Sequence, residues 1–315
     1  MTSTSPIDIK QQLIEVIEEG KSTTDPVKFS QLKQISQELS KQLHESKGTY
    51  PKDCLKNLLK TDPDKVTMLI NKMFADYPVK PILLDKPTDS EIYDDLKQWV
   101  ETHPVPTPSS TIAKYRIKSR VKQFDRIFRT VSYRPKNLTY LDYGAGDGSM
   151  ALGIGTEFQF KRPIYTTDIN QWQGIEREEI DTPDYVFKVI DPNGKIPFAQ
   201  SFDCISVLMV LHHIENYKDS IRDIVSHLNP SGIVIIREHD VNDEAVQNLI
   251  HVEHRIYNML NEKQTMDEFV KDYYGLYRSL DEWKKEFEDQ WLKCIYRGTS
   301  DGPTRYAYLA LQKKS

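Results

Sequence analysis

The chain has 315 residues, of which 38% are hydrophobic and 28% charged, and a formal net charge of −5 at pH 7. This composition predicts a globular, water-soluble protein, and the negative charge argues against a surface coated for nucleic-acid binding. No segment approaches the roughly 20 apolar residues that span a bilayer, and the N-terminus shows no signal peptide. The isolated Cys54, Cys204 and Cys294 are typical of reduced thiols, so we expect a cytoplasmic protein without a disulfide framework.

Residues 1–105 are predicted to form an α-helical accessory region. Asp25 and Pro26 are typical of a helix N-terminus, and the helical segments carry apolar stripes opposite polar faces. Pro104, Pro106 and Pro108 then mark a boundary with a second domain, residues 106–315. The accessory region is expected to pack on that domain. It could also cover an active site, bind a macromolecular substrate or hold a protein partner.

A basic helix is predicted over residues 111–131. Between Lys114 and Lys136 nine Lys and Arg residues stand against one acid, Asp125, which is a local departure from the negative net charge. Two interpretations remain open at this point. The cations are a solvated helix face, or they contact a carboxylate or phosphate group of a ligand.

A glycine-rich turn follows the first predicted strand. Residues 138–143 favour a strand, Gly144, Gly146 and Gly148 alternate with Ala145 and Asp147, and a helix is predicted from Ser149 to Gly155. Glycines let a ligand lie against the backbone, and the first helical N–H groups point at it. There is no Lys for a P-loop, and the spacing differs from the dinucleotide fingerprint.

Two acids flank this turn, Asp142 before it and Asp147 inside it. Carboxylates there would repel a pyrophosphate. They suit a cationic ligand rich in hydroxyl and amino donors, such as S-adenosylmethionine (SAM).

The later predicted strands end in polar residues at the sheet edge where open α/β folds bind ligands. The second strand ends at Asp168, which is placed to accept ribose hydroxyl groups, and the third at Asp191, placed near an adenine edge. The fourth, a long apolar run, leads into His212 and His213. A fifth strand, residues 233–240, and an alternating pair near residues 291–297 and 305–312 complete the sheet.

This ordered set resembles the class I, Rossmann-like SAM-dependent methyltransferases, and is similar to their type 11 pattern over about residues 110–315. The motif Asp142-Tyr-Gly-Ala-Gly-Asp-Gly148 matches their first motif. The resemblance implies an α/β fold with a seven-stranded, mostly parallel sheet closed by an antiparallel C-terminal hairpin, preceded here by the α-helical N-terminal region. It implies SAM as the cofactor, bound by Asp142, Gly144, Ala145, Gly146, Asp147, Gly148, Asp168, Ile169, Asp191, Pro192, Leu208 and Met209.

The catalytic candidates are His212 and His213 after the fourth strand and Glu238 and His239 in the fifth. Methyl transfer requires positioning of donor and acceptor, and a base only where the acceptor carries a proton. A metal site is not predicted, because no recognised ligand motif surrounds His251 and His254.

The methyl acceptor is left open between a small molecule and RNA. No Asn/Asp-Pro-Pro-Tyr/Phe motif follows the fourth strand, and no Lys-Asp-Lys-Glu set fits the strand ends, whereas a cap-type guanine nitrogen would need no base. The second interpretation of the chain is a catalytically weak methyltransferase-fold subunit that acts as an interaction or regulatory module through its N-terminal helices.

Overall fold

The computed structural model describes residues 6–23, 25–46, 49–73, 86, 88–102, 110–169, 171–172, 175–176, 178–190, 194–261, 264–299 and 302–314. No helix among these residues combines the length and apolar character needed to cross a membrane.

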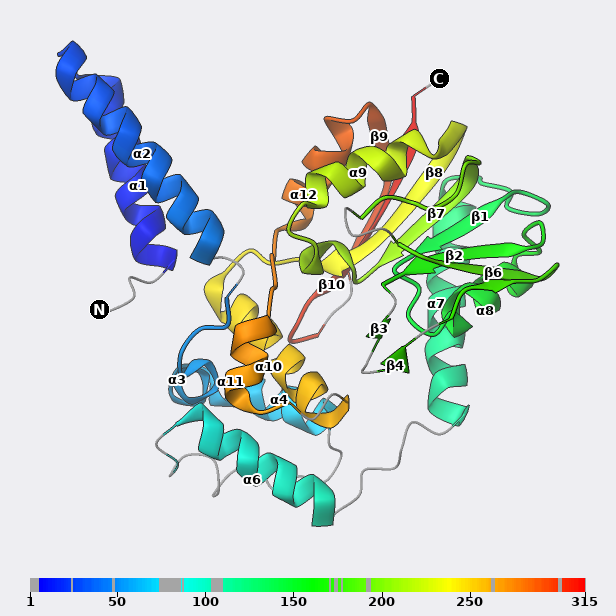
Figure 1. The fold of residues 1–315 in the computed structure, drawn as a ribbon, viewed down its shortest axis with the longest axis horizontal. Helices are drawn as coiled ribbons and strands as arrows, with labels where there is room; N and C mark the ends of the chain where they lie inside the picture. The colour runs from blue at the N-terminus through cyan, green and yellow to red at the C-terminus, as the bar shows by residue number, and fades with distance from the viewer. Residues whose placement is uncertain are drawn as a thin grey trace.

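The centre of the molecule is an eight-stranded sheet in the order β5-β6-β2-β1-β7-β8-β10-β9 (Figure 1). Its parallel strands are β1 (Tyr140–Tyr143), β2 (Ile164–Asp168), β6 (Tyr185–Val189), β7 (Phe202–Leu208) and β8 (Leu228–His239). The antiparallel members are β5 (Ile180–Asp181), β9 (Leu292–Thr299) and β10 (Tyr306–Lys313). The predicted Rossmann-like, mostly parallel sheet with an antiparallel C-terminal hairpin is therefore confirmed.

The number of strands differs from the predicted seven. The additional strand is β5, whose Ile180 and Asp181 pair with Phe187 and Val186 of β6 across a turn at Thr182. A strand of two residues is too short to show the alternation of apolar and polar side chains by which a strand is predicted from sequence. The fifth predicted strand also begins earlier than residue 233, because β8 starts at Leu228; Ser231 in this added part has a φ of 62°, and the pairing with β7 shifts register there. A two-stranded sheet of β3 (Gln171–Trp172) and β4 (Ile175–Glu176) lies outside the main sheet.

Helices cover the two faces of the sheet because its strands alternate apolar side chains between them. Val234 and Ile236 of β8 pack with α9 (Tyr217–Ser226) and α12 (Leu280–Glu288), whereas Ile233 and Ile235 pack with α7 (Ser110–Thr130) and α8 (Ser149–Glu157). A capping box formed by Ser279 and Glu282 begins α12. The result is a three-layer α/β sandwich.

A second core joins the N-terminal helices to the C-terminal half of the chain. It is built from α3 (Cys54–Thr61), α4 (Pro63–Met73) and α6 (Asp89–Thr102) packed against α10 (Glu244–Asn261) and α11 (Met266–Asp272). Asp89, at the start of α6, connects that helix to α3, because its carboxylate accepts hydrogen bonds from the backbone N–H groups of Leu55 and Lys56 at 2.9 and 2.8 Å. This helical layer thus shares one apolar interior with α10, which also borders the sheet.

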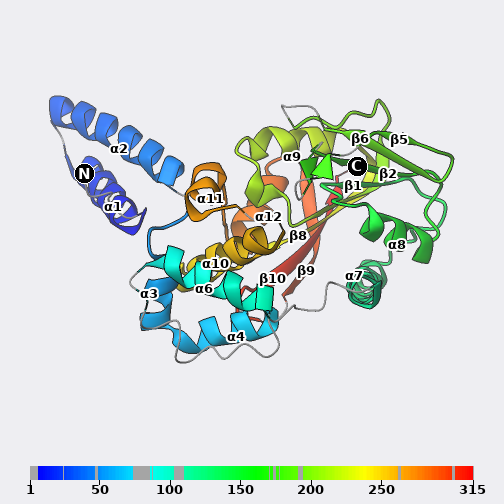
Figure 2. The same ribbon diagram turned by 60° about the horizontal axis from the view of Figure 1, so that its bottom comes forward.

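The first two helices, α1 (Pro6–Ser22) and α2 (Pro26–Ser46), form a hairpin that projects from the rest of the molecule in both views (Figures 1 and 2). The predicted cap is present, because Asp25 Oδ1 accepts a hydrogen bond from the Val27 N–H at 2.9 Å. The hairpin is held by contacts between its own two helices.

Candidate active site at the strand ends

The glycine turn between β1 and α8 has a backbone that only glycine adopts without strain. Gly144, Gly146 and Gly148 have φ values of 76°, 55° and 75°. A Cβ at Gly144 would lie 2.3 Å from Cγ2 of Val210, and one at Gly148 would lie 2.1 Å from the hydroxyl oxygen of Tyr185. Val210 and Tyr185 therefore leave no room for a side chain at Gly144 and Gly148, respectively.

The turn is also tied to the end of β2. The N–H groups of Gly144 and Ala145 both donate to the Thr167 carbonyl, at 2.8 and 3.2 Å. One oxygen of Asp168 accepts from the Gly146 N–H at 2.5 Å, and the other accepts from the Ile169 N–H at 2.8 Å. The structure therefore brings together the turn and the acid that the sequence predicted to act jointly.

The two acids that flank the turn have different surroundings. Asp142 is buried and accepts a hydrogen bond from Ser206, whose oxygen lies 2.6 Å from the Tyr140 hydroxyl. Burial raises the pKa of Asp142 to about 7, although the Ser206 hydroxyl opposes that shift. Asp147 is bonded locally, because it accepts the N–H and the hydroxyl of Ser149 at 2.9 and 2.7 Å. Asp142 thus links β1 to β7 inside the sheet, whereas Asp147 supports the start of α8.

The remaining predicted cofactor residues lie beside the turn or outside the described residues. Leu208 ends β7, and Met209 follows with a φ of 65° and an N–H bond to the Arg237 carbonyl at 2.7 Å. Asp191 and Pro192 lie outside the described part of the chain. Just beyond them, the Gly194 carbonyl accepts a hydrogen bond from the Tyr143 hydroxyl at 2.9 Å, which brings that segment to the end of β1.

Glu238 organises the turn that follows β7. It is fully buried, and one carboxylate oxygen accepts the N–H groups of Val210 and Leu211 at 3.0 and 2.8 Å. Its second oxygen lies 2.5 Å from Nδ1 of His212, in the short helix η1 (Leu211–His213). Burial raises the pKa of Glu238, and the two backbone donors act against that shift. Both oxygens of this predicted catalytic residue are thereby committed to holding η1.

The other catalytic candidates lie close to this pair. His239 is buried, and its Nδ1 is 2.7 Å from the Thr304 carbonyl. His213 is exposed, with its ring centroid 4.1 Å from that of His212. The four predicted catalytic residues therefore form one cluster at the ends of β7 and β8.

His254 of α10 joins this cluster, although it was not among the catalytic candidates. Its Nε2 lies 3.3 Å from Nε2 of His212. One ring nitrogen each of His212, His239 and His254 lies within 4.8 Å of the others, which is a spacing that a metal ion could occupy. The pairing of His251 and His254 along the helix is visible in the sequence, but their approach to β8 depends on tertiary packing.

Two arginines lie near the same strand ends. Arg237 is buried, and its guanidinium carbon lies over the Tyr306 ring, 3.9 Å from the ring centroid. Arg120 of α7 donates to the Tyr308 hydroxyl at 2.8 Å, and Tyr308 pairs with Arg237 in the sheet. Asp240, by contrast, accepts the Leu280 N–H at 2.8 Å and so anchors the start of α12.

Comparison with known proteins agrees with this geometry. The family described as "Methyltransferase domain" matches residues 113–294, so the chain belongs to the methyltransferase domain family, in its class I, Rossmann-like form. No curated protein matches the chain.

Several solved structures are similar in fold. A putative sarcosine dimethylglycine methyltransferase from Galdieria sulphuraria is 11% identical, with a TM-score of 0.43 over 62% of this chain and 84% of that one. A SAM-dependent methyltransferase from Mesorhizobium loti is 12% identical, with a TM-score of 0.41 over 57% and 93%. Magnesium protoporphyrin IX methyltransferase from Synechocystis PCC 6803, solved with bound SAH, is 12% identical, with a TM-score of 0.40 over 82% and 98%.

Proposed function

We propose that this protein is a SAM-dependent methyltransferase that acts on a negatively charged acceptor. The observation that carries the proposal is the contact of Asp168 with the glycine turn at Gly146, 2.5 Å long. A carboxylate at the end of the second strand, beside a turn in which three of five residues are glycine, suits a nucleoside whose ribose offers two hydroxyl donors. SAM supplies an electrophilic methyl group on a sulfonium centre.

The residues on either side of the turn have separable tasks in this proposal. Asp168 accepts the ribose hydroxyl groups, and the backbone of Gly144 to Gly148 follows the cofactor closely. Leu208 and Met209 line the donor pocket after β7. Asp191 and Pro192 are assigned to the adenine edge on the sequence pattern alone.

The acceptor is proposed to lie over the ends of β7 and β8. Arg237 offers a buried guanidinium there, and the N-terminal half of α7 presents Lys114, Arg116 and Lys118 to solvent. A helix that precedes a parallel strand runs opposite to it, so this half of α7 lies on the side of the carboxyl strand ends. The charge favours an acceptor with phosphate or carboxylate groups, which is RNA or an anionic small molecule.

The test is incubation of the protein with radiolabelled SAM and extract separated into RNA, protein and small-molecule fractions. Label in the RNA or small-molecule fraction, absent with Asp168→Ala, supports the proposal. Calorimetry that detects no SAM binding to the wild-type protein would overturn it. Steep loss of labelling with added salt would identify an RNA acceptor.

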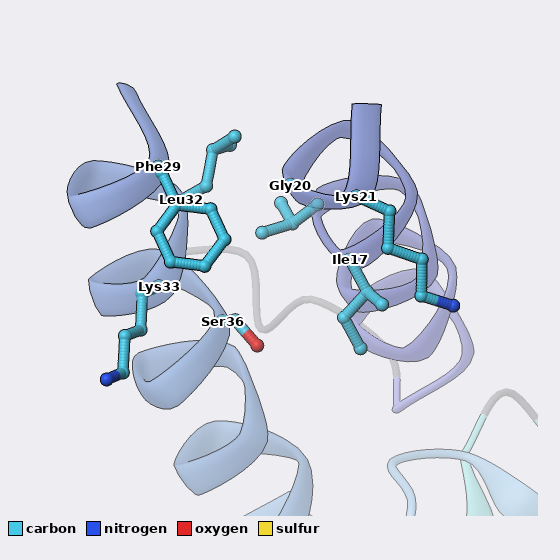
Figure 3. Close-up of a pocket in the computed structure, with 8 residues that line it drawn as sticks. Ile17, Gly20, Lys21, Phe29, Leu32, Lys33 and Ser36 are labelled. Carbon is cyan, nitrogen blue, oxygen red and sulfur yellow. The ribbon is translucent and has the colours of Figure 1, made fainter. Parts of the chain in front are cut away.

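A second candidate function is that of an interaction module. The α1–α2 hairpin exposes several large apolar side chains, namely Ile17, Val27, Phe29 and Ile35. Figure 3 shows Phe29 and Leu32 of α2 facing Ile17 of α1 across an open groove. A partner that co-purifies with the whole chain and is lost on deletion of residues 1–46, without methylation of any fraction, would favour this candidate.

A further inference from the structure

Three histidines from separate elements converge at the carboxyl ends of the central strands. His212 comes from η1 after β7, His239 from the end of β8, and His254 from the middle of α10. One ring nitrogen of each lies within 4.8 Å of the others. His212 and His239 are buried, whereas His254 is partly exposed.

In each of these imidazoles the Nδ1 atom faces a hydrogen-bond acceptor. Nδ1 of His212 lies 2.5 Å from the Glu238 carboxylate, Nδ1 of His239 lies 2.7 Å from the Thr304 carbonyl, and Nδ1 of His254 lies 2.9 Å from the Ile250 carbonyl. A carbonyl oxygen carries no proton, so Nδ1 of His239 and Nδ1 of His254 each donate one, and the Glu238 carboxylate, in its ionised form, accepts one from Nδ1 of His212. The Nε2 atoms are therefore left with lone pairs.

Two of these lone pairs face each other. Nε2 of His212 and Nε2 of His254 are 3.3 Å apart, and neither atom has a proton to share in this tautomer. A cation held between the two rings would relieve the repulsion.

We propose that His212, His239 and His254 bind a divalent transition-metal ion of the zinc class through their Nε2 atoms. Zn–N bonds of about 2.0–2.1 Å in tetrahedral geometry place two ligand nitrogens about 3.3 Å apart, which is the separation of the His212 and His254 atoms. Three imidazoles suit zinc, cobalt or nickel, whereas magnesium and calcium prefer oxygen ligands. The proposal departs from the sequence-based expectation that the chain holds no metal.

The surroundings have the form of a prepared metal site. Ligand histidines characteristically donate their second N–H to a carboxylate or a backbone carbonyl, which fixes the tautomer and the ring orientation. Glu238 and the two carbonyl groups do this here. The ring nitrogens of the three histidines lie within 4.8 Å of one another, whereas ligand nitrogens of a tetrahedral zinc ion are about 3.3 Å apart. Metal binding would therefore draw the imidazole of His239 toward those of His212 and His254.

Three protein ligands leave a fourth position open, as in catalytic rather than structural zinc sites. That position is available to an oxygen, nitrogen or sulfur atom of the acceptor, at the strand ends where the acceptor is proposed to lie. Only this use of the ion rests on the proposed methyl transfer, because binding of the ion depends on the three imidazoles alone.

The experiment is titration of the full-length, metal-free protein with Co²⁺, followed by visible absorption, and with Zn²⁺, followed by calorimetry. We expect one ion per chain and the intense visible bands of tetrahedral cobalt. His254→Ala removes one ligand from a partly exposed position and should abolish the bands. Glu238→Gln leaves the ligands in place and should weaken binding about 10- to 100-fold.

The matched control is His227→Ala. Both ring nitrogens of His227 are engaged, with the Asp223 and Phe198 carbonyls at 2.9 and 3.0 Å, so its removal should leave the stoichiometry and the bands unchanged. Circular dichroism on each variant separates loss of ligand from loss of fold. A folded wild-type protein that takes up no Co²⁺ or Zn²⁺ overturns the proposal, as does equal binding by a folded His254→Ala variant.

Measuring SAM affinity in the same samples keeps this proposal distinct from the proposed function. Metal binding without SAM binding would support the metal site and contradict the proposed methyltransferase function. SAM binding without metal binding would support the proposed function and contradict the metal site.

Discussion

The carboxylate of Asp168 accepts a hydrogen bond from the backbone N–H of Gly146, with 2.5 Å between oxygen and nitrogen. This contact joins the end of β2 to the middle of the turn after β1, and it puts an acid beside Gly146, which has no side chain to exclude a ligand. The predictions on cofactor binding depend on this relationship.

Asp168→Ala should weaken SAM binding about 10- to 150-fold, because one charge-assisted hydrogen bond contributes about 1.5–3 kcal/mol. Calorimetric titration with SAM measures the affinity of each variant. The control is Asp181→Asn in the exposed edge strand β5, which should leave the affinity unchanged. Equal affinities for wild type and Asp168→Ala would show that the ribose is held elsewhere.

Gly144→Ala should also reduce SAM affinity, by at least about tenfold, since left-handed backbone costs a non-glycine residue about 1–2 kcal/mol before any steric conflict. The added Cβ would meet Val210 at 2.3 Å. Combining it with Val210→Ala should restore part of the affinity by making room, while the backbone penalty remains.

The control for this substitution is Gly20→Ala, where a Cβ meets nothing within 4 Å. It lies in helix α1, so alanine should leave SAM binding unchanged and stabilise the helix by about 1 kcal/mol. If Gly144→Ala bound SAM as tightly as Gly20→Ala does, the turn would not be the cofactor site.

The stability of the protein should depend on the ionisation of Asp142, whose pKa burial raises from 3.8 to about 7. A raised carboxyl pKa contributes stability that is complete below about pH 4 and is lost as the pH rises through about 7. Asp142→Asn, which still accepts the Ser206 hydrogen bond, should lack this loss.

Urea unfolding at pH 5 and pH 8 measures the effect. The stability of Asp142→Asn relative to wild type should rise between these two pH values by an upper limit of about 3 kcal/mol, because about two of the three pKa units of the shift lie between pH 5 and about pH 7. Parallel pH profiles for the two proteins would mean that Asp142 titrates near its ordinary value.

Deletions should separate the two parts of the N-terminal region. Removal of residues 1–46 takes away a hairpin held by its own contacts, so the melting temperature of the remainder should change little. Removal of residues 1–105 uncovers apolar residues of α10 and α11, including Leu249, Val252, Ile256 and Phe269. Each buried side chain of this kind contributes about 1.5–3 kcal/mol, so the shorter fragment should aggregate. A soluble, monomeric 106–315 fragment on gel filtration would contradict this expectation and would support the predicted domain boundary at residue 105.

The strands of the sheet and the glycine turn could be predicted because their signals are local. The Gly144 turn has a fixed spacing, and Asp168 follows a short β-branched strand whose end must lie at the same sheet edge. The short β5, without periodicity, and the strand that continues through Asn229 to Gly232 could not be predicted, since pairing with β6 and β7 overrides local preference.

The sequence by itself determined the glycine turn and the acids that surround it, because each of these depends on residues close together in the chain. Only the tertiary structure decided that Glu238 holds η1 and that His254 meets His212 and His239. The reason is physical: α10 is positioned by an apolar interface with α3, α4 and α6, and no spacing along the chain records which imidazoles that packing brings together.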